Sequence, residues 1–231
     1  MLEVVDVHKA YGKNKVLCGV NFTMKHGVYG LLGLNGAGKT TLLNIMTGIL
    51  QVDDGIVKYH GTNIRNRKSR FKDNLGFMPQ YTTFYPKFTA REFLKYMCVM
   101  KNIPRNEHAE KINKMLEYVN LSDAADKKIG SFSGGMRQRV GIAQALINNP
   151  EIIIMDEPTA GLDPAERIRF RQTIENIAEN KIVLIATHII QDVEKMADNV
   201  LLLSDGKIVV KEQTDNMFNE LESFFTNNNC R

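Results

Sequence analysis

Residues 33–41, GLNGAGKTT, have the residue types and spacing of a phosphate-binding loop. They contain the pattern G-x-x-x-x-G-K-T, in which glycines let the backbone curl so that its N–H groups point at phosphate oxygens. Lys39 would then reach the β- and γ-phosphates of a nucleotide, and Thr40 would bind Mg²⁺. The alternative is a chance match, but an apolar segment precedes the motif and a helical pattern follows it, as the loop requires.

Further polar residues follow apolar segments that predict strands. Asp156 and Glu157 follow EIIIM, His188 follows IVLIAT, and Gln80 follows LGFMP. Because ligands of open α/β sheets bind outside the carboxyl ends of the strands, we expect these side chains to meet Lys39 at one edge. Asp156 would hold Mg²⁺, Glu157 would accept a proton from an attacking water or orient it, and His188 would contact the γ-phosphate. Taken alone, each of these residues is also consistent with an ordinary polar turn.

A second glycine-rich segment, GSFSGGMRQRV at 130–140, places Ser133, Gly134 and Gly135 at the start of a helical pattern. Bare backbone N–H groups at a helix N-terminus can bind an anion. The alternative is an ordinary glycine-rich helix start. Tyr11, beside an expected hairpin turn, would either pack half-buried or stack on an adenine ring.

The composition is that of a globular protein with one full core. The chain has 231 residues, of which 43% are hydrophobic and 24% charged,. Its net charge of +4 is too small to predict nucleic-acid binding,. No apolar run approaches the roughly 18–20 residues that cross a bilayer, and the N-terminus does not resemble a signal peptide. We therefore expect any work at a membrane to depend on a separate protein.

The cysteines and histidines show no metal-ligand pattern. Cys18, Cys98 and Cys230 lie far apart without a CxxC, which favours a reducing cytosol over a disulfide framework or a zinc site,. Residues 65–72 contain five basic side chains in eight. No aromatic residues are interleaved in a way typical of nucleic-acid binding, so a solvated face is favoured over contact with nucleic acid or lipid.

Apolar alternation and turn residues predict the strands. Two are expected within 2–24 around a turn at Gly12–Asn14, and a hairpin within 200–210 on Asp205–Gly206,. The other strand segments are 27–34, 53–64, 75–80, 151–157 and 181–188.

Capping residues and apolar spacing predict the helices, at 38–49, 89–102, 106–119, 133–149 and from Pro164. Thr89 and Glu92 would form a capping box, as would Asp163 and Glu166. N-capping alone explains Asp163. Buried strands alternating with helices indicate an α/β fold with a mostly parallel sheet covered on both faces. The helix-only run within it is expected to form an inserted lobe.

The motifs occur in the order found in one family: Tyr11, the Walker A loop at 33–40, Gln80, the signature FSGGM at 132–136, the Walker B strand with Glu157, AGLD at 160–163, and His188. Over essentially its full length the chain resembles the ATP-binding subunit of ATP-binding cassette (ABC) transporters. The resemblance implies a P-loop NTPase fold as a single domain over 1–231. A RecA-like core with an N-terminal antiparallel β subdomain would comprise 1–80 and 149–231, and a helical lobe 81–148.

The resemblance also implies ATP hydrolysis with Mg²⁺. In this family two cassettes pack head to tail around two ATPs, so Ser133, Gly134 and Gly135 would complete the γ-phosphate site of the other subunit. The residues implied for nucleotide binding are Tyr11, Gly33, Leu34, Asn35, Gly36, Ala37, Gly38, Lys39, Thr40, Thr41, Gln80, Ser133, Gly134, Gly135 and Asp163. Those implied for Mg²⁺ are Thr40, Gln80 and Asp156, and those for catalysis are Glu157, His188 and Lys39.

The partners implied are a second nucleotide-binding subunit, identical or paralogous, and separate membrane subunits docking near Gln80 and the helical lobe. The chain would thus lie on the cytoplasmic face of a membrane. The signature has Phe132 where Leu is usual and Met136 where Gln is common. Its SGGM sequence resembles that of the subgroup that includes drug, lipid and antimicrobial-peptide exporters. The alternatives are a soluble ABC-type ATPase and a nucleotide sensor without turnover; Glu157 and His188 argue against the sensor.

Overall fold

The computed structural model describes residues 1–213. An antiparallel sheet at the N-terminal side has the strand order β2-β1-β4-β5. The predicted hairpin joins its first two strands, with Tyr11 paired to Asn14 across the turn. The strands are β1 (Leu2–Tyr11), β2 (Asn14–Met24), β4 (Asp54–Tyr59) and β5 (Thr62–Asn63).

The second sheet has six strands in the order β10-β9-β3-β8-β7-β6. These are β3 (Gly27–Leu32), β6 (Leu75–Met78), β7 (Ile152–Asp156), β8 (Ile182–Thr187), β9 (Asn199–Ser204) and β10 (Lys207–Gln213). Every neighbouring pair is parallel except β9 and β10. In the hairpin between those two, Asp205 and Gly206 both have positive φ, as a two-residue type I′ turn demands,. The predicted mostly parallel sheet is confirmed.

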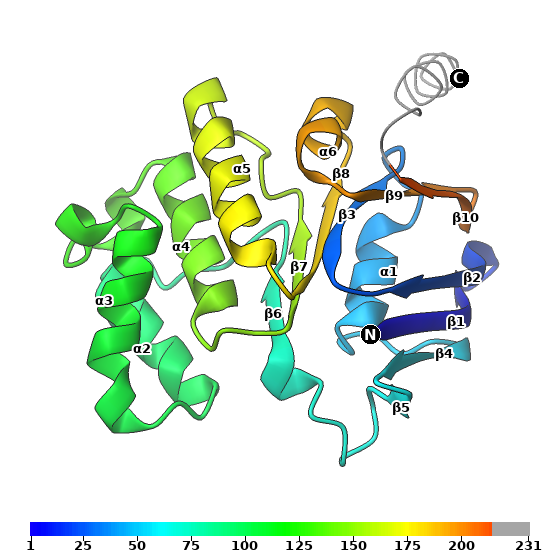
Figure 1. Cartoon of the computed structure of the whole chain (residues 1–231), viewed down its shortest axis with the longest axis horizontal. Helices are drawn as coiled ribbons and strands as arrows, with labels where there is room; N and C mark the ends of the chain where they lie inside the picture. Colours follow the sequence, from blue (N-terminus) through cyan, green and yellow to red (C-terminus); the bar gives the residue numbers. More distant parts are fainter. Residues whose placement is uncertain (214–231) are drawn as a thin grey trace.

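Alternate side chains of the central strands enter two different cores, because successive residues of a strand point to opposite faces. On β7, Ile152 and Ile154 join a core with α1 (Lys39–Met46) and the antiparallel sheet. Ile153 and Met155 join the opposite core. Figure 1 shows the helices of that second core lying across the sheet from α1. They are α2 (Ala90–Met100), α3 (His108–Tyr118), α4 (Gly134–Leu146), α5 (Pro164–Ala178) and α6 (Ile190–Met196).

Three helices begin with the side-chain N-caps that their residues suggest. The Thr89–Glu92 capping box is complete, with each residue's backbone N–H bonded to the other's side chain. Ser133 caps α4 by accepting the N–H of Met136 at 3.1 Å, and Asp163 caps α5 by accepting the N–H of Glu166 at 2.8 Å.

The capping box predicted for Asp163 and Glu166 is wrong in its second half. The Glu166 carboxylate lies 3.7 Å from the guanidinium of Arg139 on α4. A Cβ on Gly135 would come within 1.9 Å of this carboxylate, so Glu166 is drawn against the signature helix by packing and by an opposite charge. Tertiary attraction thus prevails over the local cap.

No helix within residues 1–213 is both long and apolar enough to cross a membrane. Cys18 and Cys98 are free thiols. Cys230, in the segment 226–231, lies outside the described residues. Residues 81–148 carry the three helices α2, α3 and α4.

Helix α4 lies directly on β6 because the strand presents a glycine there. A Cβ on Gly76 would come within 2.1 Å of the backbone oxygen of Ala145 and 2.8 Å of Pro150. On the helix side of the same contact, a Cβ on Gly141 would meet only the end of the flexible Met78 side chain, at 3.1 Å.

We therefore expect Gly76→Ala to lower the free energy of unfolding by about 3 kcal/mol, since a backbone carbonyl cannot move aside without displacing the helix. Gly141→Ala is the matched control and should be nearly neutral. The gain of about 1 kcal/mol in helix propensity would offset the small displacement of the Met78 side chain,. Urea unfolding followed by circular dichroism measures both. Equal midpoints for Gly76→Ala and the wild type would contradict the described contact between α4 and β6.

Candidate functional site

The carboxyl ends of β3, β6 and β7 open into one cleft of about 350 Å³. Four of the five side chains predicted to meet there do so: Lys39, Gln80, Asp156 and Glu157 line it, although they come from three distant parts of the chain. His188, the fifth, does not line the cleft but contacts Glu157. The remaining lining residues are Val16, Leu34, Asn35, Gly36, Gly38, Thr40 and Thr41.

The glycine-rich loop between β3 and α1 has the curled backbone that its sequence predicts. Gly36 and Gly38 adopt φ angles of 85° and 101°, a region that is strained for other residues,. Helix α1 begins immediately afterwards at Lys39. The Lys39 ammonium donates to the loop's own carbonyls, at 2.6 Å to Gly33 and 3.4 Å to Leu34. The loop therefore holds its single positive charge over its own concave side.

Burial shifts the pKa values of two groups in the cleft, Lys39 and Asp156, away from their ionised forms. Desolvation lowers the pKa of Lys39, although the carboxylates of Glu157 and Asp156 oppose the shift. Desolvation likewise raises the pKa of Asp156, against a hydrogen bond from Thr40. An anion bound beside Lys39 or a cation bound beside Asp156 would favour the charged form of each group. The cleft is thus electrostatically suited to an anionic ligand that brings a bound cation with it.

The oxygen donors at the base of the cleft fit Mg²⁺. The Thr40 hydroxyl donates to Asp156 at 3.0 Å, so a hydroxyl oxygen and a carboxylate already lie together, with Gln80 lining the same cleft. Magnesium in nucleotide sites takes one or two carboxylates and completes its shell with phosphates and water. Accordingly, residues 1–213 contain no cluster of three or more His, Cys, Asp or Glu side chains able to hold a metal alone.

Glu157 is held in one orientation by the end of β8. Its backbone has a φ of 51°, uncommon for a residue other than glycine, and its N–H donates to Ala186 at 2.8 Å,. One carboxylate oxygen accepts the Thr187 hydroxyl at 3.2 Å, and the other lies 2.9 Å from His188 Nδ1. With a side chain only 6% exposed, Glu157 is both buried and anchored.

Sequence reasoning missed the residues that hold Glu157 and the segment directly after it. Thr187 stands directly before His188 at a strand end, a position that could have suggested it. Nothing local pointed to Gln138, whose amide on α4 donates to the carbonyl of Pro158. Nor did anything indicate the buried bond of 2.6 Å from the Thr159 hydroxyl to Asp192 on α6.

Several residues implied by the family resemblance lie outside the cleft lining. Tyr11 is 53% exposed, with Lys9 Nζ 5.9 Å from its ring centre. Ser133, Gly134 and Gly135 start α4, and Asp163 starts α5. His188 contacts Glu157 but does not line the cleft, and Ala37 lines an adjoining hollow. Gly33 packs against the backbone of Leu203. For these residues a role toward nucleotide stays a prediction.

Bacterial transport proteins are among the similar sequences. The linearmycin resistance ATP-binding protein LnrL of Bacillus subtilis is 36% identical over 211 residues, which cover 90% of this chain and 68% of LnrL. The bacitracin transport ATP-binding protein BcrA of Bacillus licheniformis is 34% identical over 220 residues, covering 94% and 71%.

The fold matches solved ABC cassettes. The dimeric bacterial cassette MJ0796 superposes with a TM-score of 0.85 at 27% identity, over 94% of this chain and 100% of that one. The same cassette, in a post-hydrolysis state with ADP and Pi, gives a TM-score of 0.84 at 27% identity over the same shares of the two chains. Residues 17–160 match the ABC transporter family. The expected resemblance is confirmed, and the chain belongs to the ABC transporter family as an ATP-binding subunit.

Proposed function

We propose that this chain binds Mg²⁺-ATP in the cleft between the glycine-rich loop and β7, hydrolyses it as a dimer, and drives export through separate membrane subunits. The observation that carries the proposal is the convergence of Lys39, Asp156 and an anchored Glu157 on one cleft. A triphosphate would lie along the loop, with backbone N–H groups and Lys39 on its oxygens.

Glu157 is positioned to take the proton of an attacking water. As the water oxygen bonds to the γ-phosphorus, the bond to the β-phosphate oxygen breaks and ADP leaves, so the water must lose a proton. The Thr187 hydroxyl accepts the N–H of Ile189 at 3.1 Å, which directs its own proton to Glu157. The carboxylate is thereby held in place by Thr187 and His188, a geometry that a sensor without turnover would not need.

Thr40, Asp156 and Gln80 would hold Mg²⁺. Bound there, the ion would neutralise charge on the β- and γ-phosphates. These three residues would supply oxygen ligands from two strand ends and the first turn of α1, in the cleft that Lys39 also lines.

The signature residues would complete the site of a second subunit. Ser133 and Gly134 are exposed at the start of α4, and they do not line the cleft of their own chain. Exposed N–H groups at a helix N-terminus suit the γ-phosphate of a nucleotide held by another copy. ADP lacks that phosphate, so ATP would favour the closed dimer and hydrolysis would release it.

Exposed apolar side chains after Gln80 support docking of the membrane subunits. Tyr81 is 83% exposed, and further exposed apolar side chains are Tyr85, Tyr96, Val99 and Met100. The rings of Tyr85 and Tyr96 lie 5.9 Å apart, and exposed apolar side chains gathered in this way are typical of a surface for another protein,. Docking there would place the chain at the cytoplasmic face of the membrane. The linearmycin-resistance and bacitracin-transport names of LnrL and BcrA favour export over import.

Lys39→Ala is expected to weaken ATP binding by about 10- to 100-fold, because a charge-assisted hydrogen bond contributes about 1.5–3 kcal/mol. Isothermal titration with Mg²⁺-ATP measures the change. Lys15→Ala, which removes a charge outside the cleft lining, is the control. Unchanged affinity of the Lys39 variant would remove the loop from its role.

Glu157→Gln should retain ATP binding and lower turnover by at least about 100-fold, since an amide cannot accept the proton. The variant should also elute as a dimer in ATP but not in ADP during size-exclusion chromatography. Glu175→Gln, an exposed change on α5, is the control. Normal phosphate release by Glu157→Gln would exclude this residue as the base.

Complementation tests whether Ser133 acts across the dimer. A mixture of Ser133→Ala and Glu157→Gln chains forms heterodimers in which one of the two sites has both residues intact, so activity should exceed the sum of the separate variants. Lys39→Ala mixed with Glu157→Gln is the matched control and should gain nothing, because each site then carries one defect. No gain in the first mixture would place Ser133 in its own subunit's site.

A further inference from the structure

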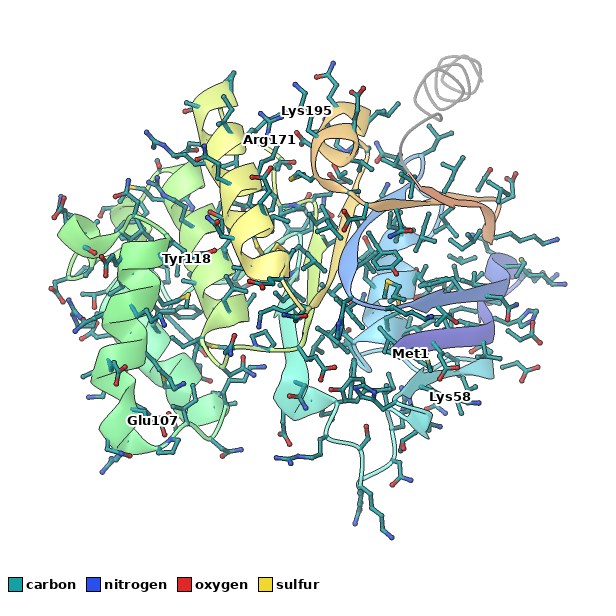
Figure 2. The ribbon with its side chains drawn as sticks, viewed as in Figure 1. Met1, Lys58, Glu107, Tyr118, Arg171 and Lys195 are labelled. Atoms are coloured by element: carbon teal, nitrogen blue, oxygen red, sulfur yellow. The ribbon has the colours of Figure 1, made fainter. Side chains whose placement is uncertain are left out.

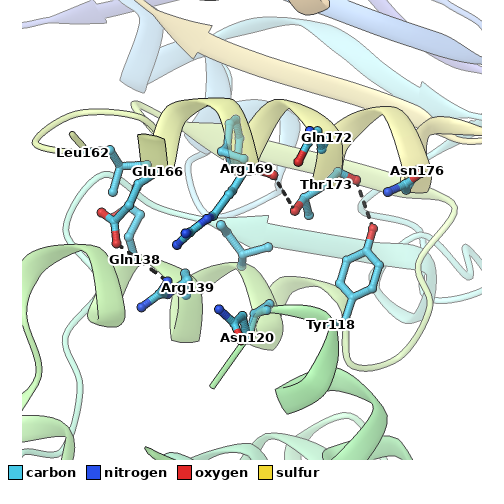
Figure 3. A pocket seen from close by; sticks show the side chains of 13 residues that line it. Tyr118, Asn120, Gln138, Arg139, Leu162, Glu166, Arg169, Gln172, Thr173 and Asn176 are labelled. Carbon is cyan, nitrogen blue, oxygen red and sulfur yellow. Dashed lines mark hydrogen bonds and ion pairs between the residues drawn. The ribbon is translucent and has the colours of Figure 1, made fainter. Parts of the chain in front are cut away.

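A second cavity, of about 340 Å³, lies between the helical lobe and α5 and is unrelated to the nucleotide cleft. The two share no lining residue. Its volume falls in the range of about 300–1,000 Å³ found for small-molecule sites. Figure 3 shows the cavity with α5 on one side and with α4 and the end of α3 on the other.

The floor of the cavity is apolar. Val119, Ile142, Leu162 and Phe170 are all buried and line it. Tyr118 stands at one end, where its hydroxyl donates to the backbone oxygen of Thr173 at 3.0 Å and so ties α3 to α5. A flat hydrophobic group would find two aromatic rings and aliphatic side chains around it.

The rim carries more positive than negative charge. Two arginines line the cavity, Arg139 from α4 and Arg169 from α5, against one carboxylate, Glu166. Figure 3 shows Arg169 reaching from α5 toward Arg139. Among residues 1–213 no hydrogen bond or ion pair engages the Arg169 guanidinium, and Glu166 approaches Arg139 only to 3.7 Å.

Arg139 adds an unsatisfied donor. Its Nε–H is buried, and within the described part of the chain it has no hydrogen-bond partner. Because this nitrogen is closed to solvent, a ligand in the cavity would meet Arg139 through its terminal guanidinium nitrogens. Together with the free guanidinium of Arg169, these nitrogens mark a place for one negative group above an apolar floor.

We propose that this cavity binds a small carboxylate with a flat apolar body. The carboxylate group would bind Arg169 and Arg139, and the apolar body would pack against Phe170. The ligand would contact α4 and α5 together. These helices begin at Ser133 and Asp163, and Gln138 of α4 also contacts the segment after Glu157. Occupancy would therefore brace the helical lobe against the core.

The test uses 2-naphthoate and its neutral isostere 2-naphthamide, titrated calorimetrically into the full chain with saturating Mg²⁺-ADP, so that the nucleotide cleft is filled. Naphthoate should bind at least tenfold more tightly than naphthamide, as expected when a charge-assisted contact is lost. Arg169→Ala should weaken naphthoate at least tenfold and leave naphthamide unchanged.

Arg171→Ala is the matched control. It removes the same charge two residues along α5, at a residue that lines a different hollow together with Lys195. Both residues are labelled in Figure 2. This variant should bind naphthoate like the wild type. Hydrogen exchange in α4 and α5 should slow when naphthoate is bound. No binding at millimolar naphthoate, equal binding of both compounds, or equal effects of the two arginine variants would overturn the proposal.

Discussion

Two buried carboxylates at the end of one strand are the constraint on which the catalytic cleft depends. Asp156 and Glu157 are almost fully buried, and carboxylates buried without partners are costly,. Thr40 bonds the first, Thr187 and His188 contact the second, and Lys39 lies near enough to influence the charge of Asp156. Thr40 and Lys39 come from the start of α1, directly after β3, and Thr187 and His188 come from the end of β8. Sheet order, loop curvature and the position of α1 are therefore all needed to keep these charges inside the protein.

Helices α4 and α5 connect this cleft to the exposed signature residues and to the arginine-lined cavity. α4 rests on β6 through Gly76, starts at the exposed signature residues, and contacts the carbonyl of Pro158 through Gln138. α5 starts at Asp163, only a few residues after Glu157, and shares the arginine-lined cavity with α4. A change at the γ-phosphate position can thus reach the lobe through direct contacts rather than through flexible loops. This arrangement suits a subunit that converts nucleotide state into movement.

The sequence predicted what depends on local pattern. The continuous apolar run IIIM predicted a strand buried on both faces, the Thr89 box marked the start of α2, and glycine spacing predicted the loop before Lys39. It could not predict contacts made between distant segments. The αL backbone of Glu157 and the Gln138 bond have no local signature, and Glu166 leaves its expected cap for Arg139. The cavity beside Arg169 was missed because only packing of three helices creates it.

The central claim is that each catalytic cleft is completed by the signature residues of another subunit. It is tested most directly by measuring ATP hydrolysis per mole of chain across a wide dilution series, with light scattering at each concentration. The account predicts that specific activity falls on dilution, in step with loss of the ATP-bound dimer, and that ADP alone supports no dimer. Constant specific activity down to concentrations at which scattering shows only monomer would contradict it.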